Sequence, residues 1–163
     1  MPKLIHAKLL LILTLLTPLI LTPLNAANAD PQTVAVNGTI DQTLFFSGCQ
    51  SPIGECGQGP VTGNILNGQM IGILQTFTPT PTGIAFTATA TITTAKGNLY
   101  ATATLFQNFG SETITATLHI TGGTLRYQHT TGILNLTEPA PDVNGVQHYL
   151  YTGSLSKDVD QGN

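Results

Sequence analysis

The chain has no tryptophan and only two cysteines, and charged residues make up 8% of its 163 positions. Five side chains are basic, and two of these, Lys3 and Lys8, precede an apolar run near the N-terminus. Beyond residue 29, three basic side chains stand against eight acidic ones, a net charge of −5 with histidine neutral. Nucleic acids and anionic lipids are bound through clustered lysine and arginine, so this composition excludes both as partners.

The N-terminal segment has the pattern of a secretory signal peptide. The apolar run 9–24 follows the two lysines, and Ala27-Asn28-Ala29 fits the small-x-small rule for signal-peptidase cleavage. Pro18 and Pro23 interrupt the run, which is shorter than the roughly 20 residues of a membrane span. We predict a signal peptide at 1–29, a secreted or periplasmic protein, and no membrane association after cleavage.

Removal of the signal peptide leaves 134 residues, 163 less 29, which suits one domain with one core. We place a barrel domain at 30–155 and a polar C-terminal tail at 156–163. Cys49 and Cys56 enclose a short loop within the glycine- and proline-rich segment 47–60. In an exported protein this pair predicts one disulfide, which stabilises the fold by about 2–3 kcal/mol. A metal site needs more ligands than this loop supplies.

Strict alternation of apolar and polar residues runs through most of the chain. Residues 113–121 have one apolar face, made of Ile114, Ala116, Leu118 and Ile120. This period of two is typical of a strand with one buried face, and residues 84–93, 99–106 and 146–155 share it. No segment repeats every 3.6 residues. We therefore predict an all-β fold of eight or nine antiparallel strands with essentially no helix.

Short connections between these strands favour a closed barrel over a two-sheet sandwich. The dipeptide Asn67-Gly68 is typical of a two-residue hairpin turn. Residues 78–83 contain two prolines and are predicted to be a loop, because proline cannot donate to a central ladder. Closure also removes the exposed edges of the threonine-rich strands. The fold prediction is an eight-stranded antiparallel β-barrel.

The most distinctive motif is Ile-Thr-Gly-Gly-Thr-Leu-Arg-Tyr-Gln-His-Thr-Thr-Gly-Ile-Leu at 120–134. It resembles the pattern Ile-Thr-Gly-Gly-Thr-Gly-Arg-Tyr/Phe, then Ala-Thr-Gly-Thr-Leu, of the allene oxide cyclase and dirigent barrels and their secreted bacterial relatives. The resemblance implies an eight-stranded barrel, a homo-oligomer (trimer or dimer) and an apolar cavity for a hydrophobic ligand. Leu125 replaces a glycine of the pattern, and Gln128-His129 replaces small residues. The motif serves the fold, so the plant activities do not carry over.

The alanines on the apolar strand faces suggest room inside the barrel. Small inward side chains leave space for an apolar ligand. Alternatively, they only let curved strands pack against bulky neighbours. The alanines concerned are Ala88, Ala90, Ala101, Ala103 and Ala116.

Arg126 and Tyr127 each have two interpretations. Arg126 clamps a ligand carboxylate or pairs with Glu112 or Glu138 to fix a turn. Tyr127 forms a pocket wall or plugs the barrel end. The residues predicted to bind a ligand are Phe86, Leu99, Leu105, Leu118, Arg126, Tyr127 and His148.

No motif in the sequence indicates catalysis or metal binding. A Gly-x-Ser-x-Gly elbow is absent, and His119, His129 and His148 lack ligand spacing, so we predict no catalytic residue, metal or cofactor. The favoured function is non-catalytic binding of a small hydrophobic molecule in the barrel interior. Three alternatives stay open: a cyclase-like or isomerase-like enzyme that acts by shape, a structural or adhesive surface protein with a filled core, and a surface binder that uses the outward threonines.

Overall fold

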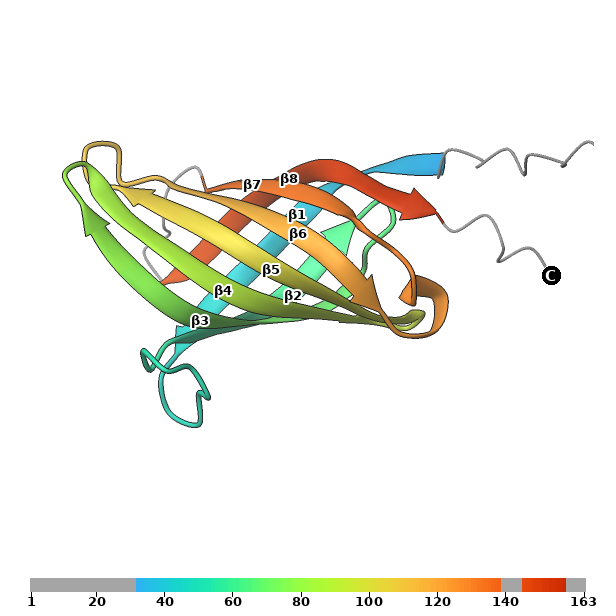
Figure 1. Cartoon of the computed structure of the whole chain (residues 1–163), viewed down its shortest axis with the longest axis horizontal. Helices are drawn as coiled ribbons and strands as arrows, with labels where there is room; N and C mark the ends of the chain where they lie inside the picture. The colour runs from blue at the N-terminus through green and yellow to red at the C-terminus, as the bar shows by residue number, and fades with distance from the viewer. Residues whose placement is uncertain (1–31, 139–144, 158–163) are drawn as a thin grey trace, which may run out of the picture.

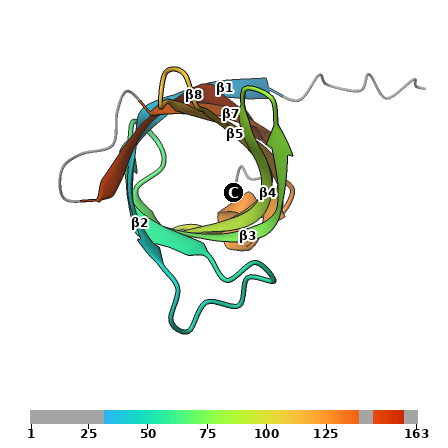
Figure 2. The same ribbon diagram turned by 90° about the vertical axis from the view of Figure 1, so that its left-hand side faces the viewer.

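Eight antiparallel strands form a closed barrel in the computed structural model, which describes residues 32–138 and 145–157. Each strand pairs with the next, and β8 pairs with β1 to close the ring (Figures 1 and 2). The predicted fold is therefore confirmed, while the predicted signal peptide lies outside the described residues. The strands are β1 Gln32–Phe45, β2 Cys56–Gly63, β3 Gly68–Thr80, β4 Gly83–Thr94, β5 Gly97–Asn108, β6 Ile114–Gly123, β7 Gly132–Glu138 and β8 Val146–Lys157.

A single 3-10 turn, η1 Leu125–Tyr127, is the only helical element in the described ranges. It lies between β6 and β7, and the two views place it at the rim of one opening of the barrel (Figures 1 and 2). Within 32–138 and 145–157, no helix is long and apolar enough to cross a membrane.

Several strand boundaries differ from the prediction. β1 is continuous from Gln32 to Phe45, and β8 runs through Lys157 into the predicted tail. The predicted loop at 78–83 instead begins inside β3, where Pro79 pairs with Ile84. Proline is tolerated there because β2 pairs with β3 only as far as Ile73, which leaves the far end of β3 with one neighbour.

The inward faces of the strands form one cluster of buried apolar side chains. On β4, β5 and β6 the inward residues include the five alanines, as predicted. On β1 and β2 they include glycines, and a Cβ atom at Gly63 or Gly38 would overlap the hydroxyl of Tyr151. Tyr151 thus reaches from β8 across β1 to β2 and fills the space beside Gly38 and Gly63, which we call the glycine wall.

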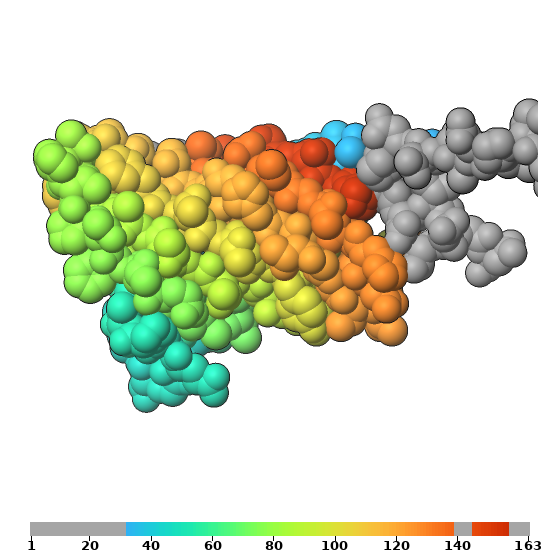
Figure 3. All heavy atoms as spheres, in the orientation of Figure 1, coloured from blue at the N-terminus to red at the C-terminus, as the bar shows by residue number. Residues whose placement is uncertain are grey.

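The predicted disulfide joins Cys49 and Cys56. It closes a loop that stands out from the side of the barrel (Figure 3). The loop is attached to β3 at Leu74, whose backbone N–H donates to the Glu55 carbonyl at 3.2 Å and whose carbonyl accepts from the Ser51 hydroxyl. The loop therefore continues the pairing of β3 beyond the start of β2.

Charged residues separate toward the two openings of the barrel. Lys96, Arg126 and Lys157 lie where even-numbered strands finish, and we call this opening the basic end. The described acidic residues lie toward the other opening, the acidic end, where odd-numbered strands finish; they are Asp41, Glu55, Glu112 and Glu138. All six phenylalanines also lie in the half of the barrel toward the acidic end, namely Phe45, Phe46, Phe77, Phe86, Phe106 and Phe109.

Candidate functional site

A pocket of about 650 Å³ opens at the basic end. Its wall comes from the start of β1, the β2–β3 and β4–β5 turns, the η1 segment and the end of β8. This mixture of turns and strand ends gives it both charged and apolar surfaces. The lining residues are Val34, Asn64, Ile65, Asn67, Lys96, Arg126, Tyr127, Thr130, Leu155 and Ser156.

Lys96 and Arg126 supply the charge of this pocket, and both side chains are exposed. The backbone N–H of Arg126 donates to the Lys96 carbonyl at 3.3 Å, which holds η1 against the β4–β5 turn. Neither cation forms an ion pair or a side-chain hydrogen bond with a described residue. The predicted pairing of Arg126 with Glu112 or Glu138 is wrong, because both acids lie at the acidic end.

The rest of the pocket is apolar wall with one available hydroxyl. Tyr127 is 5% exposed and lines the pocket, so it acts as both wall and plug. Thr130 is 6% exposed, and its hydroxyl forms no hydrogen bond with the described residues. By contrast, the amide of Asn64 bonds the backbone of Asn37 and Ala35 at 3.0 and 3.1 Å and is already satisfied.

Leu125, the residue before Arg126, has a backbone that suits glycine better. Its φ is 51°, in the left-handed region that costs a residue with a Cβ atom about 1–2 kcal/mol. The allene oxide cyclase and dirigent pattern has glycine at this position. Thr124 anchors the turn, since its N–H donates to the Asn98 carbonyl at 2.9 Å and its hydroxyl accepts from the Asn98 N–H at 3.0 Å.

The other predicted ligand-binding residues do not join this pocket. Leu99 and Leu118 are buried in the core, while Phe86 and Leu105 are half-buried farther along the barrel. His148 lies on the outer surface of β8, so it does not belong to an interior site. Its Nδ1 atom lies 2.8 Å from Oδ1 of Asp41 on β1.

A second polar cluster, inside the acidic end, was not predicted. The Glu138 side chain is 1% exposed, and burial raises the pKa of its carboxyl, with the positive charge of His148 partly opposing the shift. Burial and the nearby Glu138 charge also raise the pKa of Tyr149. The alternation that places Leu134 and Leu136 inward extends to Glu138, and following it by one more step would have found this residue.

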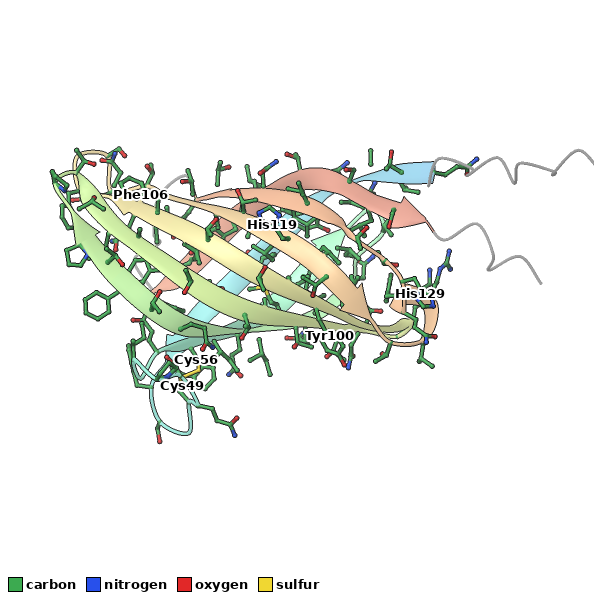
Figure 4. The ribbon with its side chains drawn as sticks, viewed as in Figure 1. Cys49, Cys56, Tyr100, Phe106, His119 and His129 are labelled. Carbon is green, nitrogen blue, oxygen red and sulfur yellow. A yellow bond between two sulfur atoms is a disulfide. The ribbon has the colours of Figure 1, made fainter. Side chains whose placement is uncertain are left out.

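The histidines and the outward threonines form no compact site. His119 is on the outside of β6 and His129 is at the basic end, far from the disulfide (Figure 4). In the described part of the chain, no group of three or more His, Cys, Asp or Glu side chains could hold a metal ion. Thr87, Thr104 and Thr117 are aligned across β4, β5 and β6 on the outer face, which curves with the barrel.

Comparison with known proteins adds no functional residue to these two sites. The resemblance to the allene oxide cyclase and dirigent barrels stays a prediction from one motif. Neither a family model, nor a curated protein, nor a solved structure matches the chain.

Proposed function

We propose that this barrel binds a small amphiphilic anion, a molecule with an apolar body and a carboxylate or similar group, at its basic end. The observation that carries the proposal is the 650 Å³ pocket, which joins two cations without a described acidic partner to an apolar wall. Pockets of this size hold small-molecule ligands. The anionic group would lie between Lys96 and Arg126, with its apolar body against Tyr127 and Leu155.

The packing of the barrel supports a site at its end rather than at its centre. The inward side chains form one buried cluster, and Tyr151 fills the space along the glycine wall of β1 and β2. A bulky ligand at the centre would have to displace these side chains, at a cost typical of overpacked cores. The apolar part of the ligand would therefore lie at the opening of the barrel and not at its centre.

The separation of chemical groups favours binding over catalysis. A general acid or base must lie within hydrogen-bonding reach of the reacting atoms. Glu138, the described carboxyl with a raised pKa, lies toward the opening opposite the pocket. A cyclase-like or isomerase-like reaction in the basic-end pocket would therefore lack this group.

The disulfide supports the proposed setting outside the cytoplasm. Disulfides persist in oxidising compartments and are rare in reducing ones. The pair Cys49–Cys56 therefore agrees with a secreted or periplasmic protein. Assembly as a dimer or trimer remains part of the prediction from the family resemblance.

Calorimetric titration with octanoate and with uncharged 1-octanol tests the proposal. We expect octanoate to bind more tightly, with an affinity that falls as salt screens the cations. Arg126→Gln and Lys96→Gln should each weaken octanoate about three- to tenfold, because each removes one charge contact. His129→Gln is the matched control, since His129 is exposed at the same end but does not line the pocket. Equal octanoate affinity in the wild type and the Lys96/Arg126 double variant would refute the site.

A further inference from the structure

Four inward polar side chains gather inside the acidic end, within an otherwise apolar barrel. Glu138 on β7 is 1% exposed, and Tyr149 on β8 and Gln42 on β1 are 3% and 8% exposed. Gln147 connects two of them: its Oε1 atom accepts from the Tyr149 hydroxyl and from Nε2 of Gln42, each at 3.3 Å. The cluster therefore spans three adjacent strands, with the half-buried Gln147 nearest the opening.

Glu138 is the unsatisfied member of this cluster. Neither of its carboxylate oxygens has a hydrogen-bond partner among the described residues. Its register partner on β6 is Ile114, which offers no polar atom. Buried polar groups are almost always hydrogen-bonded, and exceptions with a shifted pKa are concentrated at functional sites.

The atoms of the cluster that receive no hydrogen bond are acceptors. The two oxygens of Glu138 are buried without a partner, and Oε1 of Gln42 receives no hydrogen bond within the described ranges. A ligand group that satisfies the Glu138 carboxylate must donate hydrogen bonds. An ammonium carries three donors and no acceptor, and its positive charge also compensates a buried carboxylate.

The surroundings of the cluster also suit a cation with an apolar body. The described acidic residues lie toward this opening, and three phenylalanines there are exposed, namely Phe46, Phe77 and Phe109. Aromatic faces attract cations as well as apolar groups. The Phe109 N–H donates to the Thr82 carbonyl at 3.0 Å, which ties the β5–β6 turn to the β3–β4 turn. Phe109 thus lies in a turn that is joined to the end of the β3–β4 hairpin, and Phe77 lies within β3 of that hairpin.

We infer that the acidic end is a second binding site, for a small apolar molecule that carries a protonated amine. The ammonium donates to the Glu138 carboxylate and to Oε1 of Gln42, and the apolar body lies toward the phenylalanines. Asp41 and His148 pair with each other on the outer face of β1 and β8, so neither side chain belongs to the inward cluster, although the charge of His148 acts on Glu138. A carboxylate ligand fits this end poorly because it would face Glu138.

The test compares octylammonium, octanoate and 1-octanol by calorimetric titration of the whole protein at pH 7.5. We expect Glu138→Gln to weaken octylammonium about tenfold or more and to leave octanoate unchanged, because a buried charge pair is lost at one end only. Arg126→Gln should weaken octanoate and leave octylammonium affinity unchanged. The matched control is Glu112→Gln, which removes an exposed carboxylate at the same end and should change octylammonium affinity less than about twofold.

Gln42→Met provides a second variant, since it removes the other acceptor and should weaken octylammonium about threefold. Thermal melts establish that each variant is folded. Unchanged octylammonium affinity in both Glu138→Gln and Gln42→Met overturns the inference, as does 1-octanol binding as tightly as octylammonium. Failure of octanoate to bind would reject the basic-end proposal alone, because the two sites use different residues and opposite charges.

Discussion

The two ends of the barrel are made by the same eight strands, yet they hold their charges in different ways. At the basic end, Lys96 and Arg126 are exposed beside an open pocket. At the acidic end, Glu138 is buried without a described partner. Water stabilises the exposed cations, whereas the buried carboxyl loses its hydration. The charged groups of the basic end therefore cost the fold little stability, whereas the buried carboxyl of the acidic end reduces it.

The largest expected effect concerns the loop at the acidic end. Replacing Cys49 and Cys56 together by serine should lower the free energy of unfolding by about 2.5 kcal/mol, because the open loop gains entropy in the unfolded chain. Urea denaturation measures this loss. Octanoate affinity at the basic end should stay the same, since the loop does not line that pocket. An unchanged urea midpoint would show that the hydrogen bonds to Leu74 hold the loop without the disulfide.

Glu138→Gln should change stability in a pH-dependent way. The raised pKa means that the folded protein holds this proton more tightly than the unfolded chain, whose carboxyl has its usual pKa near 4.5. The stabilisation from the proton is complete below that pKa and is lost as pH rises through the pKa of the folded state. The free energy of unfolding of the variant should therefore exceed that of the wild type by about 1–2 kcal/mol at pH 7.5, and the two should be equal at pH 4.

Thermal unfolding at these two pH values measures the difference. Glu112→Gln is the control, because Glu112 is exposed at the same end and should show little change. A gain that is equal at pH 4 and pH 7.5 would point to packing rather than ionisation at Glu138.

The sequence predicts the strands and their faces better than it predicts the ends. The alternating pattern places Leu99 and Leu118 on the inward face of their strands. This face is strongly specified, because a shift of the strand register by one residue would expose all of its apolar side chains. The basic end depends on topology: Lys96 precedes β5 and Arg126 follows β6, so the antiparallel hairpin returns the chain to the same opening. Composition and periodicity give no sign of this meeting before the strand ends are known.

The sequence predicts even less well whether side chains fill the interior of the barrel. The inward alanines suggest space, but that space depends on side chains from other strands. Tyr151 crosses β1 to reach Gly63, and a strand pattern read by itself does not reveal such a contact. His148 shows the same limit, since the two faces of β8 are clear in the sequence while the choice of the inward face needs its partners on β1 and β7.

The smallest expected effect separates backbone strain from side-chain loss at the basic end. Leu125→Gly should raise the free energy of unfolding by about 0.5–1 kcal/mol, because glycine accepts the left-handed backbone while adding some entropy to the unfolded chain. Leu125→Ala removes most of the same exposed side chain but keeps the Cβ atom, so it should bring no gain. Urea midpoints of both variants measure the difference, and equal stability would argue against strain at this turn. If octanoate affinity also stays constant in Leu125→Gly, the Arg126 position is set by its hydrogen bond to Lys96 and by the Thr124–Asn98 pair rather than by the leucine side chain.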